Sequence, residues 1–122
     1  METLEFGDLT IEVVPSAAIE PIQLAWCGRS NDRQPGKVLD PYLGAVLQEA
    51  SAAGRAVEMR FEALEHMNSS TLTAIIGAVQ KARHLRVPLA IVFDRSLKWQ
   101  KLGFDALRVL AKGDGLLDIR GI

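Results

Sequence analysis

The feature that most constrains the fold is the alternation of helical and extended patterns in the last two thirds of the chain. Apolar residues recur at helical spacing in three segments, and a short run of β-branched or aromatic residues follows each of them. The expected helices begin at Asp40-Pro41, near Asn68 and at Ser96, and the expected strands cover residues 57–61, 88–93 and 116–119. Helices that alternate with strands at these intervals are typical of right-handed parallel crossovers, so the sequence predicts an α/β fold.

The first third of the chain has a different pattern. Residues 4–14 alternate apolar and polar side chains around a Gly7-Asp8 turn signal, which predicts a β-hairpin. Residues 22–27 predict a third strand that ends at Gly28. The expected element order is therefore β-β-β-α-β-α-β-α-β, a mixed β-sheet with helices mainly on one face.

Periodicity also predicts which helix faces are buried. In the first helix, Asp40 would cap the free N–H groups and Gly54 would end the helix. In the second helix, we expect the buried residues to be Leu72, Ile75, Ile76 and Val79, and the outward-facing residues to be Ser70, Thr73 and Gly77. In the third helix, capped by Ser96, we expect the inward residues to be Trp99, Leu102, Ala106, Leu107, Val109 and Leu110.

Composition favours one globular domain that spans residues 1–122, since 48% of the residues are hydrophobic and 24% are charged. The net charge of −1 gives no general attraction to nucleic acid or to an anionic membrane. The N-terminus carries acids where a signal peptide carries basic residues, and no apolar run is long enough to span a bilayer. We therefore expect a cytoplasmic protein that binds neither nucleic acid nor membrane.

Motifs for catalysis and metal binding do not occur. The chain has no GxGxxG, GxxxxGK[ST], GxSxG or HExxH pattern, and its one cysteine and two histidines suggest no zinc site. His66 lies three residues before Ser69, but no oxyanion loop accompanies this pair, and Cys27 is typical of a small buried residue. We expect no enzyme activity, no cofactor and no metal.

The most informative segment is the junction between the 57–61 strand and the second helix. Residues 67–72 read Met-Asn-Ser-Ser-Thr-Leu, which places several hydroxyls where one capping side chain would be enough. The outer face of the helix continues with small residues, and small residues allow another surface to approach closely. We therefore predict a partner surface here, together with the long polar loop 29–37. Its candidate residues are Asn68, Ser69, Ser70, Thr71, Thr73, Arg29, Asn31 and Arg33.

The stretch from Val57 to Ile76 resembles the STAS family, whose best-studied members are bacterial anti-sigma factor antagonists. That family has an apolar alternating strand, a loop, then M-D-S-S-G-L and a run of small and aliphatic residues. Asn68 stands here in place of the Asp, and Thr71 in place of the Gly. The resemblance implies a STAS-like sheet and a regulatory protein–protein interaction domain in signal transduction and transcription regulation. It implies binding to a serine kinase that doubles as an anti-sigma factor, phosphorylation of Ser69, and dephosphorylation by a PP2C-type phosphatase.

Two alternatives stay open. A STAS-like scaffold or adaptor would use the same surface without phosphorylation. A small anionic ligand or nucleotide would instead bind at the N-terminus of the second helix, although residues 67–72 contain no glycine. The expected oligomeric state is a monomer or a weak homodimer.

Overall fold

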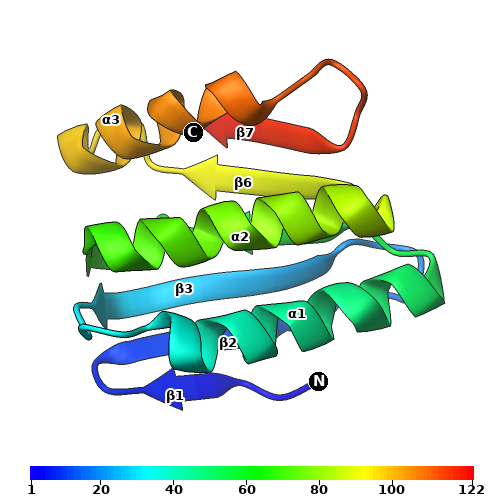
Figure 1. Cartoon of the computed structure of the whole chain (residues 1–122), viewed down its shortest axis with the longest axis horizontal. Coiled ribbons are helices and arrows are strands. Elements are labelled where there is room, and N and C mark those ends of the chain that lie inside the picture. The colour runs from blue at the N-terminus through cyan, green and yellow to red at the C-terminus, as the bar shows by residue number, and fades with distance from the viewer.

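The computed structural model describes all residues from 1 to 122. The chain forms seven strands, three α-helices and one short 3-10 helix, η1 (Figure 1). In chain order they are β1 (Leu4–Phe6), β2 (Leu9–Val14), β3 (Ile22–Ser30), α1 (Gly36–Ala53), β4 (Val57–Arg60), β5 (Leu64–Met67), α2 (Ser69–Leu85), β6 (Leu89–Phe93), α3 (Lys98–Ala106), η1 (Leu107–Leu110) and β7 (Leu117–Gly121).

One mixed sheet joins all seven strands in the order β1-β2-β3-β4-β6-β7, and β5 pairs with β3 beyond the end of β4. The β1–β2 and β2–β3 pairs are antiparallel, whereas the pairs from β3 to β7 are parallel. The predictions of an α/β fold and of a mixed sheet are therefore confirmed. None of the three α-helices combines the length and apolar character that a membrane span requires.

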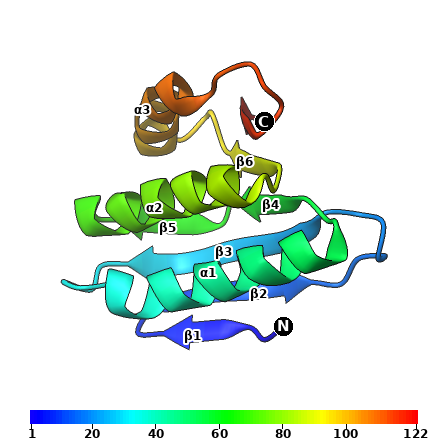
Figure 2. The same ribbon diagram turned by 45° about the vertical axis from the view of Figure 1, so that its right-hand side comes forward.

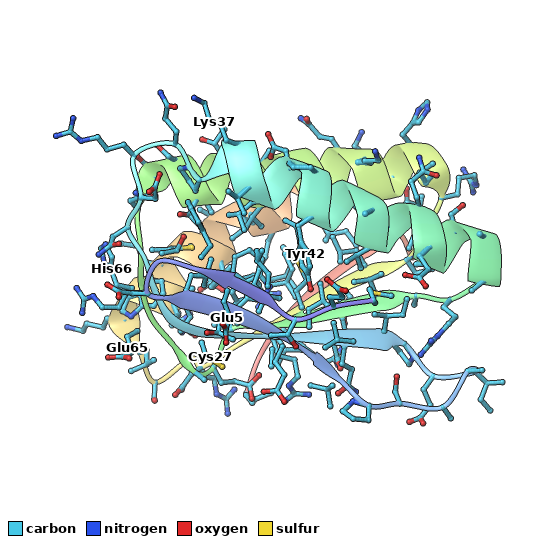
Figure 3. The ribbon with its side chains drawn as sticks, turned by 90° about the horizontal axis from the view of Figure 1, so that it is seen from below. Glu5, Cys27, Lys37, Tyr42, Glu65 and His66 are labelled. Atoms are coloured by element: carbon cyan, nitrogen blue, oxygen red, sulfur yellow. The ribbon has the colours of Figure 1, made fainter.

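The helices α1 and α2 lie side by side over one face of the sheet, and α3 packs against β6 and β7 (Figures 1 and 2). The view from below shows no helix on the opposite face (Figure 3). The core fills the space between sheet and helices. At its centre, Phe61 contacts Trp26 and Phe104 with ring centroids 4.9 and 4.7 Å apart.

The strand β3 is longer than the sequence predicted, since it continues through Gly28 to Ser30. The register of the β3–β5 pairing shifts after Gly28, because Gly28 pairs with Leu64 and Arg29 with His66. The φ of +86° at Gly28 and the position of the Asp8 carbonyl oxygen, 2.1 Å from where a Cβ would lie, both require glycine. The residue without a partner at the shift is Glu65 of β5, and the extra length of β3 gives β5, which the sequence did not reveal, a strand to pair with.

The predicted start of the first helix at Asp40-Pro41 is wrong. α1 begins at Gly36, and Pro41 lies inside it. The amides of Val38 and Leu39 both donate to the Pro35 carbonyl oxygen, and Leu39 is fully buried. Burial of that additional leucine favours an earlier start, so the predicted loop 29–37 shrinks to residues 31–35. The predicted end at Gly54 is confirmed, with φ of +66°.

The predicted inward face of the third helix is wrong in part. Leu107 is buried, but Leu102 and Val109 are 79% and 81% exposed. The buried ridge of α3 is instead Gln100 and Phe104, one turn apart. The Gln100 amide nitrogen donates to the carbonyl oxygens of Phe61 (2.6 Å) and Leu64, which leaves that polar side chain satisfied in the core. Ser96 does not cap the helix, because its hydroxyl donates to Asp94.

The strand β4 carries a charged side chain toward the helix-free face. Glu58 is only 7% exposed, and its carboxylate accepts from Arg120 at 2.5 Å and lies 3.7 Å from Arg60. Arg60 also binds Glu62 at 2.9 Å, and Arg120 binds Asp118 at 2.8 Å. The sequence predicts that one face of this strand is more open, and no helix covers the face that carries Glu58. Arg60 and Arg120 nevertheless cover the Glu58 carboxylate, so it is buried.

Candidate functional site

The junction that the sequence singled out is built around Asn68, the N-cap of α2. Its side-chain oxygen accepts the backbone N–H of Thr71 at 2.8 Å. Its backbone carbonyl accepts the N–H of Leu72 at 3.2 Å, which is the first hydrogen bond of the helix. The N–H groups of Ser69 and Ser70 have no acceptor in the chain. One side chain therefore supplies the cap, as the sequence suggested, and the neighbouring serines are not needed for it.

A buried hydroxyl pair ties this cap to the sheet. The Thr71 hydroxyl lies 2.8 Å from the Asn68 side-chain oxygen, to which it donates, and 2.6 Å from the Ser30 hydroxyl. Because the single Thr71 proton goes to Asn68, the Ser30 hydroxyl is the donor to Thr71. Thr71 is fully buried, so its predicted place on the partner surface is corrected to a structural one. Ser30, which the sequence analysis did not select, is the residue that completes this network.

The loop 31–35 is held against the N-terminus of α2. The Asn68 side-chain nitrogen donates to the Asp32 carbonyl oxygen at 2.7 Å, and its backbone N–H donates to the Ser30 carbonyl at 3.0 Å. Within the loop, the Asp32 carboxylate accepts the N–H of Gln34. An asparagine at position 68 thus does what an aspartate cannot, because only the amide can donate to the loop.

The two parts of the predicted partner surface are therefore adjacent in space. Of its eight candidates, Asn68 is half-buried and the exposed ones are Ser69, Ser70, Thr73, Arg29, Asn31 and Arg33. Figure 3 shows Glu65 and His66 of β5 at the same end of the sheet as Lys37, which follows the loop. The pairing of Arg29 with His66 in the parallel ladder brings this third segment to the same end.

Ser69 is exposed at the first position of α2, and its hydroxyl makes no hydrogen bond within the chain. By contrast, the Thr73 hydroxyl donates to the Ser69 carbonyl oxygen at 3.1 Å. Ser69 does not cap the helix, because Asn68 has that role. Ser69 is free to react without loss of a structural contact.

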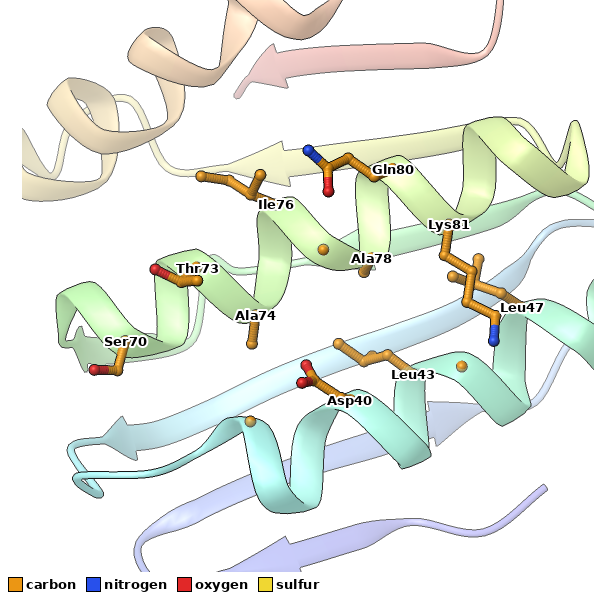
Figure 4. Close-up of a pocket in the computed structure, with 13 residues that line it drawn as sticks. Asp40, Leu43, Leu47, Ser70, Thr73, Ala74, Ile76, Ala78, Gln80 and Lys81 are labelled. Carbon is orange, nitrogen blue, oxygen red and sulfur yellow. The ribbon is translucent and has the colours of Figure 1, made fainter.

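Next to this surface, a groove of about 620 Å³ separates the outer sides of α1 and α2 (Figure 4). Six of its thirteen lining residues are Gly, Ala or Ser. From α1 they are Gly36, Asp40, Leu43, Gly44 and Leu47, and from α2 they are Ser70, Thr73, Ala74, Ile76, Gly77, Ala78, Gln80 and Lys81. The prediction that Ser70, Thr73 and Gly77 face outward is confirmed. Ile75 and Val79 are buried, and Leu72 and Ile76 are half-buried.

Gly77 has no structural reason to be glycine. Its φ is helical, and a Cβ built on it would meet no atom within 4 Å. A glycine inside a helix is less stable than an alanine by about 0.5–1 kcal/mol. The glycine therefore lowers the stability of α2, and it leaves the wall of the groove without a side chain at this position.

The groove carries one charge of each sign. The Asp40 carboxylate lies 3.1 Å from the position of a Cβ on Gly36, and the Lys81 ammonium lies 3.2 Å from that position on Gly44. Neither group forms an ion pair within the chain. Figure 4 shows both directed into the space between the helices. Gly44 and Gly77, which lie inside the two helical patterns, are the sequence signal for this groove. The sequence-based prediction of an outward-facing small surface uses only Gly77.

The remaining reactive side chains do not assemble into a centre. No group of three or more His, Cys, Asp or Glu side chains could hold a metal ion. His66 lies exposed on β5, and Cys27 is half-buried on the helix-free face of the sheet (Figure 3). The arrangement at the α2 junction offers a surface for binding and a free hydroxyl.

The sequence was compared with protein-family models and with curated proteins, and none of them matches it.

Proposed function

We propose that this chain is a regulatory protein-binding domain of the STAS type, which docks a partner through the surface around Ser69 and is switched by phosphorylation of that serine. The partner implied by the resemblance is a serine kinase that doubles as an anti-sigma factor, with a PP2C-type phosphatase acting in reverse. The function requires no catalysis by this chain and no cofactor.

The observation that carries the proposal is the hydrogen bond from the Asn68 side chain to the Asp32 carbonyl oxygen. It holds the loop bearing Asn31 and Arg33 beside the first turn of α2, so that one partner can contact both segments at once. The buried Ser30 and Thr71 hydroxyls fix the same two segments from below. A surface that is rigid before binding loses little conformational entropy when it docks.

The position of Ser69 suits a switch that leaves the fold unchanged. The kinase would transfer the γ-phosphoryl group of ATP to the Ser69 hydroxyl oxygen, releasing ADP and the hydroxyl proton. The phosphate adds a charge of about −1.5 to −2, which the N-terminus of a helix stabilises. The N–H groups of Ser69 and Ser70 are available to it. Phosphorylation would therefore keep α2 intact while it places charge and bulk inside the docking surface.

The test compares Ser69→Ala, Ser69→Asp and wild type in the native host. We expect affinity purification followed by mass spectrometry to recover a serine kinase with wild type and Ser69→Ala, and to recover about tenfold less with Ser69→Asp. Peptide mass spectrometry should find a phosphate on Ser69 of the wild type. Ser51→Asp, which adds the same charge at an exposed site on α1, is the matched control and should bind as wild type does.

The outcomes separate the alternatives. Equal recovery of a partner by all variants, with no phosphate on Ser69 under any growth condition, would support the scaffold and contradict the switch. Loss of the partner with Ser69→Ala as well as Ser69→Asp, again without phosphate, would make Ser69 a direct contact.

A further inference from the structure

The helix α3 and the short helix η1 that continues it are apolar on two sides. One side, with Phe104 and Leu107, is buried in the core. The other side carries Leu102, Ala106 and Val109, of which Leu102 and Val109 are 79% and 81% exposed. A surface helix whose only neighbour is its own core has polar residues on the outer side. The outer side of α3 and η1 therefore has the composition of a covered surface, although nothing in the chain covers it.

The exposed apolar residues form one row, the α3 stripe, which consists of Leu102, Ala106 and Val109. Ala106 lies four residues after Leu102, which places both on the same side of an α-helix. Val109 lies three residues after Ala106, and residues at this spacing in a 3-10 helix lie directly above one another. The half-buried Trp99 and Leu110 border the row. Single exposed apolar residues are common on protein surfaces, whereas a contiguous apolar patch marks an interaction site.

The segment that carries the α3 stripe is strongly basic. Residues 95–112 contain five basic residues and one acidic residue, Asp105, whereas the whole chain has a net charge of −1. Lys101 and Arg108 both bind the Asp105 carboxylate, with nitrogen–oxygen distances of 2.6 and 3.0 Å. The basic residues of the segment that form no ion pair in the chain, all of them exposed, are Arg95, Lys98 and Lys112. The surface thus has an excess of cations that an acidic partner would neutralise.

An open hollow of about 360 Å³ lies beside Leu102. It is lined by Leu102 together with Lys98, Lys101 and Asp105. An apolar side chain of a partner would pack against Leu102 there, and a carboxylate next to it would reach an ammonium group. The hollow therefore favours a ligand that is both apolar and acidic.

The charges distinguish between possible occupants. A second copy related by a two-fold axis would bring the same cations together, because such an interface uses the same patch on both subunits. An anionic lipid surface would neutralise the cations, but it would also meet the Asp105 carboxylate in the hollow, and it would gain only Leu102 and Val109 as large exposed apolar side chains. A protein helix can place its carboxylates opposite the lysines and away from Asp105. It also matches the straight α3 stripe, because helices pack with their rows of side chains interlocked.

We propose that the outer face of α3 and η1 is a docking surface for an acidic amphipathic α-helix of a partner protein. The apolar side chains of that helix pack along Leu102, Ala106 and Val109, and its carboxylates pair with Lys98 and the neighbouring cations. The proposal stands on α3 and η1 alone and does not depend on the regulatory function proposed above.

The test measures the binding of a defined probe to the full chain. The probe is a synthetic, fluorescein-labelled peptide of about 16 residues that places leucines along one side of a helix and glutamates along the other sides. Fluorescence anisotropy at low salt, from about 1 to about 500 μM protein, covers micromolar dissociation constants, and we expect the probe to bind in this range. Two control peptides should bind at least about tenfold more weakly. One has the same residues in an order that forms no apolar face, and the other has lysine in place of each glutamate.

Variants of the chain locate the binding site. Leu102→Glu should raise the dissociation constant of the probe at least about tenfold, because it removes an apolar contact and adds a charge of the same sign as the probe. Ile19→Glu is the matched control and should bind as wild type does, since Ile19 is 97% exposed on the loop between β2 and β3 and the net charge changes equally. Lys98→Glu should also weaken binding, whereas Lys37→Glu, at an exposed position of α1, should not.

Four results would overturn the proposal. Failure of the wild type to bind the probe shows that the surface does not accept an acidic helix. Equal binding of the probe and of the peptide without an apolar face shows that net charge alone is responsible. A probe that binds Leu102→Glu as tightly as wild type has its site elsewhere. Binding of the wild type, but not of Leu102→Glu, to vesicles of equimolar phosphatidylserine and phosphatidylcholine would assign the surface to a membrane.

Circular dichroism of each variant verifies that its fold is intact. Leu102→Ala against Ile19→Ala repeats the comparison without a change in charge, so the site can be tested even where a glutamate disturbs α3. Leu102→Ala should weaken binding of the probe, and Ile19→Ala should not.

Discussion

Asn68→Ala tests the structural role of the α2 junction most directly. The substitution removes three side-chain hydrogen bonds, with the Thr71 N–H at 2.8 Å, the Thr71 hydroxyl at 2.8 Å and the Asp32 carbonyl at 2.7 Å. Ser69→Ala, at the next residue, removes none. The two variants change adjacent positions of the same helix start, so each controls for the other.

The expected magnitudes follow from burial. Loss of an N-cap side chain costs about 1 kcal/mol. The Thr71 hydroxyl is fully buried and keeps its 2.6 Å hydrogen bond with the Ser30 hydroxyl, but its own proton loses the Asn68 acceptor and has only the Ser30 carbonyl at 3.4 Å, which adds about 1 kcal/mol. The Asp32 carbonyl is on an exposed loop and regains water, which adds little. We therefore expect Asn68→Ala to lower the free energy of unfolding by about 2 kcal/mol, and Ser69→Ala to change it by less than about 0.5 kcal/mol.

Urea denaturation followed by circular dichroism measures both. With an m-value of about 2 kcal/mol/M, Asn68→Ala should move the midpoint down by about 1 M while leaving the slope unchanged. Ser69→Ala should overlay the wild-type curve. A Ser69→Ala midpoint as low as that of Asn68→Ala would refute the assignment of Asn68 as the cap, and the argument that Ser69 is free for modification would fail with it.

Two further predictions concern the rest of the fold. Leu107→Ala should lower the free energy of unfolding by about 2–5 kcal/mol, whereas Leu102→Ala should change it by less than about 0.5 kcal/mol, because the first side chain is buried and the second is 79% exposed; equal urea midpoints would contradict the observed burial along α3 and η1. Hydrogen bonds lower the pKa values of Asp94, Asp105 and Asp114 below 3.8, so their contribution to stability is present above that pH and is lost as the pH falls through their lowered values. Thermal melts of wild type and Asp105→Asn between about pH 2 and 6 measure this, and a variant whose melting temperature falls as steeply as that of wild type would contradict it.

Prediction from the sequence succeeded where one local signal was enough. The hairpin followed from period-two alternation around Gly7-Asp8, and α2 followed from apolar spacing and the Asn68 cap. In both segments the secondary structure that the local sequence favours is also the one that buries its apolar side chains. The partner surface rests on a local signal of the same kind, an excess of hydroxyls at a helix start, and stays a prediction.

Prediction failed where tertiary contacts choose between local alternatives. Asp40-Pro41 is a good helix start by local rules, but burial of Leu39 favours a start at Gly36. In α3, the stripe through Leu102 and the ridge through Phe104 both have helical spacing. The ridge wins because Gln100 on it satisfies the backbone carbonyls of Phe61 and Leu64, 39 and 36 residues away in the chain.

The site shows the same division. Thr71 and Ser69 are both hydroxyl residues in the first turn of one helix, yet one is fully buried and the other exposed. The difference arises from Ser30 on β3, whose hydroxyl binds the Thr71 hydroxyl from 41 residues away in the chain and which pairs with Met67 of β5 in the sheet. No pattern within residues 67–72 carries that information.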